Sequence, residues 1–456
     1  MKRFVSIWLA VSSLLFAALM ATAATRPQYG GTLHVTMRES LSSLDPADTS
    51  DPDSFARRSV TGLMFDTLVR LDDTGHVNPV LAESWQSMRG NQRWQLRLRH
   101  GVKLHDGSAL TADVAAASLR FANPAWNVSS DGDAVIIEVE GANPELLSEL
   151  ALPRNAIVKR DGDRPSGTGP FHLVDWQPGR KLTLAANEDC WRGRPFLDGI
   201  EIEMAKNYRE QMTALDLGKT DLAEVAPEQT HRVSQEGHRL ANSAPMELVA
   251  LLFIHDANTQ EEKSLRQALA LSIERGSMRS VLLQGAGQPT ASILPTWISG
   301  YGFVFSADAD LAKARQLRSQ VRTAPAWTLG YDSNDPLARL LADRIALNAR
   351  DAGLSVQPTP SVGVDLRLVR IPLASSDPWI ALEDVISQAG LPAPRNRSGS
   401  AEELYATEQA AIANERVMPL FHLPVSEASS SNLRNWALRA EGSLDLDDAW
   451  LETTKP

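Results

Sequence analysis

Residues 327–356 carry the pattern of a β-α-β unit, and this unit constrains the fold more than any other feature of the chain. An apolar strand, 327–331, is followed by Asp335-Pro336, a pair typical of a helix N-cap and the first helical residue. Leucine and isoleucine then recur at helical spacing until Gly353, and residues 354–356 begin a second strand. Such units build open sheets of parallel strands, and ligands bind outside the carboxyl ends of those strands.

The length and composition of the chain predict a globular protein of several domains. A chain of 456 residues is too long for one hydrophobic core, so we expect two or three domains. With 43% hydrophobic and 22% charged residues, it has neither the composition of a disordered protein nor that of a multi-span membrane protein. A formal net charge of -11 without a basic run argues against nucleic acid as a partner.

The N-terminus has the three regions of a secretory signal. Lys2 and Arg3 precede a mostly apolar run, 4–20, and Ala21-Thr22-Ala23 is a small-residue cleavage site, so residues 1–24 are predicted to be a signal peptide. The alternative is an uncleaved anchor, but the run falls short of the roughly 20 apolar residues that span a membrane. The single cysteine, Cys190, excludes both an intramolecular disulfide and a lipid anchor at the signal. We therefore expect a free periplasmic protein without stable membrane insertion.

Several further elements follow from local patterns. Alternation and apolar runs predict strands at 30–35, 94–98 and 248–254, and a hairpin at 167–185. Helical spacing predicts helices within 53–71, from Thr111 onward, and at 264–273. The charged, Gly- and Pro-rich segment 159–166 indicates a lobe boundary.

Motifs for catalysis or metal binding are not evident in the sequence. The pairs His100/His105 and His231/His238 lack the i, i+4 spacing of two ligands on one helix face. Segment 162–168 has P-loop glycine spacing but carries Thr168 in place of the lysine, and no serine has a hydrolase-elbow setting. A pair of catalytic carboxylates is an alternative that the sequence leaves open, because nothing singles out two of its many Asp and Glu residues. We expect no enzymatic activity, no cofactor and no metal site.

Aromatic residues on loops are the clearest candidates for a ligand pocket. The chain has 11 tryptophans, several of which stand beside Gly, Pro or charged residues. Trp297 follows Pro295, Tyr301 lies between two glycines, and Trp379 follows Asp377-Pro378. Such rings can line a pocket, or they can fill seams between elements.

Taken in chain order, several blocks resemble the family 5 extracellular solute-binding proteins, the peptide, dipeptide and nickel-complex receptors of ABC transporters. The resemblance spans nearly the whole mature chain and lies in the joint order of these blocks: Gly30-Gly31-Thr32-Leu33, Leu44-Asp45-Pro46, 79–85 (PVLAESW), 96–107 (LRLRHGVKLHDG), 110–114 (LTADV), 167–171 (GTGPF), 191–202, 265–269 (LRQAL) and 419–422 (PLFH).

The resemblance implies an α/β fold of the type II periplasmic binding protein kind, with three lobes and a ligand cleft between lobes I and III. Lobe I is expected at 25–44, 166–244 and 429–456, the inserted lobe II at 45–165 and lobe III at 245–428. Capture would shift the protein from an open to a closed form, because only a ligand that touches both lobes stabilises the closed form.

The implied function is that of a periplasmic, monomeric binding protein that captures a small-molecule or peptide ligand and delivers it to an ABC transporter permease. A short peptide is the leading guess, and metal chelates, haem, sugars and opines remain open as ligands. The alternatives from other classes are a signalling receptor that presents its closed form to a membrane sensor, and an enzyme on the same scaffold.

The resemblance also suggests site residues. Arg38, Glu39 and Ser40 on the first loop would face five residues of lobe III: His255, Trp297, Tyr301, Asp377 and Trp379. Segment 371–378 (IPLASSDP) departs from the family pattern, because Ala374, Ser375 and Ser376 stand where that loop should supply an aspartate and a tryptophan. A buried ammonium without a carboxylate is costly, so amine recognition would need Asp377 or Glu39 as a substitute.

Overall fold

The computed structural model describes residues 26–72, 74–160, 164–301, 305–392, 400–413 and 415–452. The predicted signal peptide, 1–24, lies outside the described residues. Helices of the described part all fall short of the length and apolar character needed to cross a membrane.

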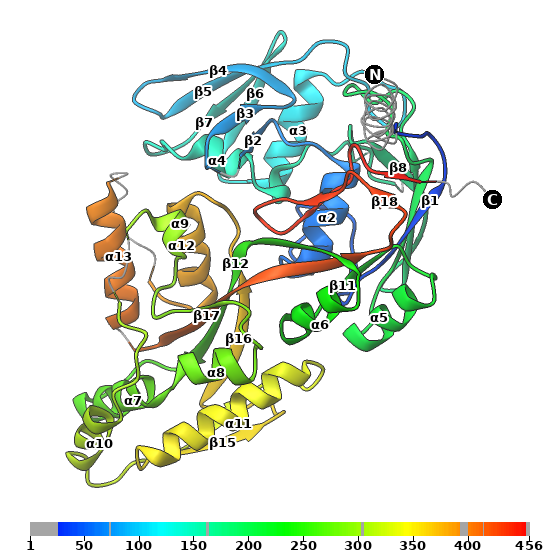
Figure 1. Ribbon diagram of the computed structural model, residues 1–456. Helices are drawn as coiled ribbons and strands as arrows, with labels where there is room; N and C mark the ends of the chain where they lie inside the picture. The colour runs from blue at the N-terminus through cyan, green and yellow to red at the C-terminus, as the bar shows by residue number, and fades with distance from the viewer. Residues whose placement is uncertain are drawn as a thin grey trace, which may run out of the picture.

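One large sheet runs through most of the molecule (Figure 1). It has 11 strands, and β13 (Gln288–Pro289) pairs with β17 beside the main path. Along that path the strands are β15 (Ser355–Thr359), β14 (Ala326–Gly330), β16 (Leu366–Pro372), β12 (Arg239–Phe253), β17 (Val417–Ser429), β11 (Leu222–Glu224), β1 (Thr32–Thr36), β10 (Gly199–Glu203), β9 (Lys181–Ala186) and β8 (Phe171–Gln177).

Strands β12 and β17 belong to both halves of this sheet. At one end β17 pairs with β11, and at the other end β12 pairs with β16, while the two strands pair with each other along their length. Their register shifts around Pro245, which lies opposite Pro424. Because proline has no N–H to donate, the ladder is interrupted there. Figure 1 shows the two strands crossing from one half of the molecule to the other.

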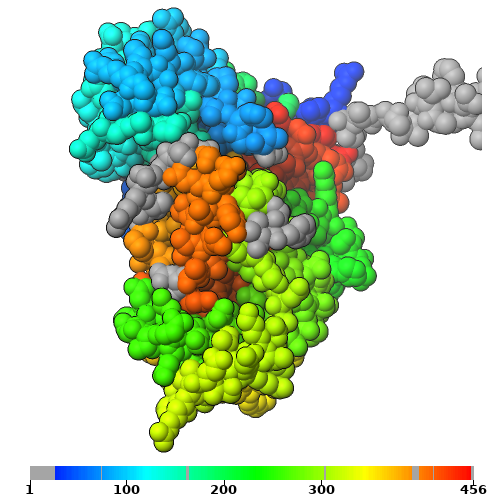
Figure 2. Space-filling view, turned by 90° about the vertical axis from the view of Figure 1, so that its left-hand side faces the viewer, coloured from blue at the N-terminus to red at the C-terminus, as the bar shows by residue number. Residues whose placement is uncertain are grey.

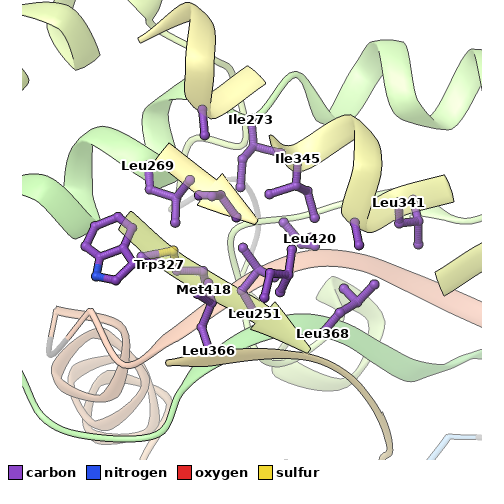
Figure 3. Close-up of a cluster of buried hydrophobic side chains, with 14 of the residues drawn as sticks. Leu251, Leu269, Ile273, Trp327, Leu341, Ile345, Leu366, Leu368, Met418 and Leu420 are labelled. Atoms are coloured by element: carbon purple, nitrogen blue, oxygen red, sulfur yellow. The ribbon is translucent and has the colours of Figure 1, made fainter. Parts of the chain in front are cut away.

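The predicted β-α-β unit is confirmed. Strands β14 and β15 are parallel neighbours, joined by α11 (Pro336–Asp351). Asp335 caps this helix by accepting a hydrogen bond from the Leu337 N–H at 3.0 Å. Its apolar face packs on the core of the third lobe, where Leu341 and Ile345 meet strand residues such as Leu251 and Leu368 (Figure 3).

A second unit of the fold has its own sheet and core. Four antiparallel strands follow the order β4 (Ala82–Met88), β5 (Arg93–Leu98), β7 (Ala134–Glu138) and β6 (Asn127–Asp131), and α3 (Ala112–Ala122) packs against them. The predicted strand at 94–98 and the predicted helix start at Thr111, whose side chain caps α3, are confirmed. The blue and cyan residues of this unit form one end of the molecule in Figure 2.

Helix α2 (Phe55–Met64) is shorter than the predicted helical stretch of 53–71. The chain becomes extended at Phe65, and residues 69–71 form β2 (Val69–Leu71). Val60 and Leu63 of α2 belong to the same hydrophobic core as Leu33 of β1, whereas Leu68 belongs to the core of the four-stranded unit. We therefore propose that lobe II begins after α2 rather than at residue 45, and the other predicted lobe boundaries stay proposals.

Candidate functional site

Three neighbouring cavities open around Arg38 and Glu39, which lie just beyond Met37 at the end of β1, and together we call them the interlobe cleft. The main cavity has a volume of about 610 Å³. Pro52, Asp53 and Ser54, which precede α2, line its first side together with Arg38 and Glu39. The other side consists of residues from the third lobe, so this cavity lies between the two halves of the large sheet.

The floor of the main cavity is a patch of adjacent strand residues. Glu247 lies opposite Pro372 across the β12–β16 ladder and opposite Leu423 across the β12–β17 ladder, and Val249 lies opposite Arg370. The first turns of α11 add Leu337, Ala338 and Leu341, and the second half of α12 (Pro378–Gln388) adds Asp384 and Gln388. The lining of the pocket therefore mixes apolar side chains with charged ones.

A second cavity, of about 960 Å³, continues from Arg38 and Glu39 along the first lobe. It is lined by Ser40, by residues 205 and 207–210 around the start of α5 (Tyr208–Asp216), and by Glu228. Asp332 and Asn334, which precede α11, line it from the third lobe. A third, smaller cavity, of about 50 Å³, lies between Tyr208, Glu224 and Arg370.

Arg370 is held by two carboxylates of its own lobe. Its guanidinium group forms an ion pair with Glu247 and another with Asp335, the latter at 3.0 Å. Burial alone would lower the pKa of Arg370, but Glu247 and Asp335 raise it well above its ordinary value. Asp335 therefore caps α11 with one oxygen and fixes Arg370 with the other.

Arg38 is held in the same way from the first lobe. Its guanidinium group pairs with Glu39 at 2.8 Å and lies 5.6 Å from the ring centre of Tyr208. Its backbone N–H donates to Glu224, and Glu39 accepts a hydrogen bond from the Ala56 N–H in the first turn of α2 at 3.3 Å. Burial opposes the charge on Arg38, but Tyr208, Glu39 and Glu224 raise its pKa.

Two buried carboxyl groups stand behind Arg38. Glu224 of β11 lies directly opposite Glu427 of β17, so both side chains project from the same face of the sheet. Burial, followed by the charge of Glu39, raises the pKa of Glu224 to about 7. Glu427 is 1% exposed, neither of its carboxyl oxygens has a hydrogen-bond partner, and burial raises its pKa well above the ordinary value. Both carboxyl groups are therefore harder to ionise than an exposed glutamate.

The structure brings three of the eight predicted site residues together in the cleft: Arg38, Glu39 and Ser40. The other five lie outside the lining of the cavities described above. His255 is exposed just after β12, and Trp297, 36% exposed, lies on the short helix α9 (Thr296–Ser299). Their part in ligand binding stays a prediction.

The remaining three predicted residues have structural partners. The Tyr301 hydroxyl donates to the buried carboxylate of Glu408, and Trp379 is buried in the core beneath α12. Asp377 caps α12 by accepting hydrogen bonds from the N–H groups of Trp379 and Ile380, at 3.0 and 3.2 Å. Asp377-Pro378 thus repeats the helix-start chemistry of Asp335-Pro336.

The cleft residues that the sequence reasoning missed include Glu247, Arg370 and Asp335. Glu247 and Arg370 each stand beside apolar residues of a strand, and a charge at such a position was a usable signal because it is costly without a partner. Among the residues that the structure describes, no group of three or more His, Cys, Asp or Glu side chains could hold a metal ion.

Comparison with known proteins gives a consistent family match. The family model described as "Bacterial extracellular solute-binding proteins, family 5 Middle" matches residues 76–366. The chain is 25% identical over 279 residues to the nickel-binding protein NikA of Staphylococcus aureus, which covers 58% of this chain and 55% of that protein. It is also 25% identical over 302 residues to the oligopeptide-binding protein AppA of Bacillus subtilis, covering 58% of this chain and 54% of that protein. These alignments span little more than half of each relative.

Solved structures resemble the fold over almost its whole length. Staphylococcus aureus NikA in complex with Ni(L-His)2 has a TM-score of 0.80 at 18% identity, covering 92% of this chain and all of that one. The dipeptide-binding protein of Pseudoalteromonas sp. SM9913 in complex with Met-Leu has a TM-score of 0.79 at 16% identity, with the same coverage. The predicted α/β fold of the type II binding-protein kind is confirmed.

Proposed function

Because the chain belongs to the bacterial extracellular solute-binding proteins of family 5, we propose that it captures a small solute in the interlobe cleft and delivers it to the permease of an ABC transporter. The observation that carries this proposal is the main cavity of about 610 Å³, which is lined by both halves of the large sheet. A solute that contacts both halves stabilises their closed arrangement, and a permease can then distinguish the loaded protein from the empty one.

The relatives support the proposal in different ways. Names among them refer to nickel and oligopeptides, and one solved neighbour holds the dipeptide Met-Leu. A short peptide therefore remains one candidate solute beside other small compounds. The proposed place of action is the periplasm, and the proposed state is a monomer that binds its ligand without chemical conversion.

Closure on ligand binding is the test of this function. The purified mature protein is incubated with the dialysable fraction of yeast extract, which contains amino acids, small peptides, amines, nucleotides and sugars. We expect the radius of gyration from small-angle X-ray scattering to fall and the melting temperature to rise. Native mass spectrometry then identifies the retained solute. An unchanged radius and no retained compound would refute capture by closure.

Locking the two sides of the cleft together gives this experiment a control. Thiols introduced by Ser40→Cys and Asn334→Cys stand on the two sides of the second cavity, so a bifunctional maleimide that spans the cavity should hold both sides together. Cys190 is buried, so it does not compete for the reagent. We expect the crosslinked variant to take up no solute and the unreacted variant to behave as the wild type.

A further inference from the structure

We propose that the solute held in the interlobe cleft is an organic cation with an apolar body. The inference rests on the proposed function, since it names the chemical class of the compound that the same cleft binds. It follows from the charges of the lining, from the way the cleft arginines are already paired, and from carboxyl groups that lack a cationic partner.

The lining of the cleft is strongly acidic. Around the main cavity, two guanidinium groups, those of Arg38 and Arg370, stand against six carboxyl groups: Glu39, Asp53, Glu247, Asp332, Asp335 and Asp384. The second cavity adds Asp51, Glu210 and Glu228 against Arg209. A cleft lined mostly by one sign of charge concentrates ligands of the opposite sign.

Both arginines of the main cavity are already paired with carboxylates of the lining. Arg370 is paired with Glu247 and Asp335, and the guanidinium group of Arg38 is paired with Glu39. The Nε atoms of both arginines lack a hydrogen-bond partner, so the pairing occupies only part of their donors. An anionic solute that reached these donors would still have to approach the carboxylates around them.

Two carboxyl groups of the cleft form no ion pair within the described part of the chain. Asp332 is exposed and its side chain accepts only the Asn334 N–H, and Asp384 accepts only from the side chain of Gln388. Burial and the neighbouring charge of Asp53 raise the pKa of Asp384, and the charges of Arg58 and Arg154 offset this only in part. Both groups line the main cavity.

Glu427 adds an unpartnered polar group beside the cleft. Its side chain is nine-tenths buried or more, both of its oxygens lack partners, and it shares a sheet face with Glu224, which lines the small cavity behind Arg38. Glu427 itself lines none of the three cavities. A carboxyl group buried in this way costs free energy unless a donor or cation reaches it, so a cationic donor at the back of the small cavity would relieve that cost.

The floor of the main cavity supplies the apolar part of the recognition. Val249, Leu337, Leu341, Leu368 and Leu423 line it between the charged groups, and all five also belong to the buried core of this half of the sheet. Burial of an apolar body against this floor favours an organic cation, such as an amine or a basic peptide, over a hydrated metal ion.

Retention from a complex mixture tests the charge of the solute. The full mature protein is loaded with the dialysable fraction of yeast extract, washed and denatured, and the released compounds are identified by mass spectrometry. We expect cations at neutral pH to be enriched at least tenfold over neutral and anionic compounds. Retention of mainly neutral or anionic compounds would overturn the inference and leave the proposed function standing, whereas retention of nothing would refute the proposed function and the inference with it.

A matched pair of variants tests the assignment to the cleft. The double variant Asp332→Asn with Asp384→Asn removes two carboxylates that form no ion pair. The amide oxygens of the new asparagines can still accept the hydrogen bonds from Asn334 and Gln388. The control, Asp308→Asn with Asp351→Asn, removes the same charge from exposed positions outside the cleft lining. We expect the cleft variant alone to lose about tenfold in cation enrichment. Equal enrichment in both variants would overturn the inference.

Discussion

Glu427 is a single residue at which binding and stability oppose each other. Its carboxyl group is buried and unpartnered, and its pKa is raised well above the ordinary value. Because the folded protein then holds a proton that the unfolded chain releases above a pKa of about 4.3, stability falls as pH rises from there toward the raised pKa. Glu224, with a pKa of about 7, contributes in the same direction between those two values.

Replacing this carboxyl group should therefore stabilise the protein. We expect Glu427→Met to raise the free energy of unfolding by about 1–3 kcal/mol at pH 7.5, because it removes a buried polar group without partners. At pH 4.5 the gain should be smaller, since that pH lies close to the unfolded pKa of about 4.3 and the unfolded chain then also holds much of the proton. Melting curves at both values measure the difference. Glu83→Met, at an exposed position of β4, is the control.

The outcome at Glu427 also bears on the ligand. If the group belongs to the cation site, the more stable Glu427→Met protein retains less cation from yeast extract. A variant that is less stable than the wild type at pH 7.5 would mean that the side chain has a partner that satisfies it, and the argument for a missing positive charge at the back of the cleft would lose its support.

At the scale of elements, helices α11 and α12 both begin with an Asp-Pro pair, but only the capping aspartate of α11 also binds a residue of the cleft. Asp335 caps α11 and binds Arg370 in the cleft, whereas Asp377 caps α12 outside the cavity lining. Loss of either cap should cost about 0.5–2 kcal/mol of stability. Only Asp335→Ala should also change solute binding, because it frees Arg370 from one of its two carboxylates.

This comparison decides between two views of the site. Calorimetric titration of a cation recovered from yeast extract should give an affinity reduced severalfold for Asp335→Ala and an unchanged affinity for Asp377→Ala. If Asp377→Ala instead reduced the affinity and Asp335→Ala left it unchanged, Asp377 would belong to the site, as the resemblance in sequence implied. Arg370 and the two carboxylates that bind it would then lie outside the site.

Helix starts and strands were predictable because their signals are local. Asp335-Pro336 and the apolar period of α11 lie within one stretch of chain, and the strand ahead of it has the expected apolar run. The pairing of Arg370 with Glu247 was not predictable, because it depends on the register of β16 against β12, which are far apart in sequence. For the same reason the sequence pointed to Arg38 and Glu39, which lie just beyond Met37 at the end of β1, but gave no sign that the Trp379 ring packs in a buried core. The part of all three residues in ligand binding stays a prediction.

At the scale of the whole molecule, the two long strands join both halves of the large sheet, and we expect these halves to unfold as one unit. β12 and β17 contribute to the sheet on both sides of the Pro245–Pro424 interruption, so neither half can lose these strands alone. The four-stranded unit has its own sheet and its own core, with Leu96 and Ile137 among its buried residues. We therefore expect differential scanning calorimetry to resolve two transitions, the smaller one from this unit.

Ligand binding should separate the two transitions further. The cleft is lined by residues of the large sheet and its helices, and strands β4–β7 contribute no lining residue to the three cavities described. A solute from yeast extract should therefore raise the larger transition and leave the smaller one unchanged, because binding stabilises only the unit that it contacts. Amide hydrogen exchange gives the same test by segment, with slower exchange expected in 245–253 and 366–372 and none of this slowing in 127–138. If exchange slowed as much in 127–138 as in 245–253 and 366–372, the four-stranded unit would take part in closure. The proposed division of the chain into lobes would then have to be redrawn.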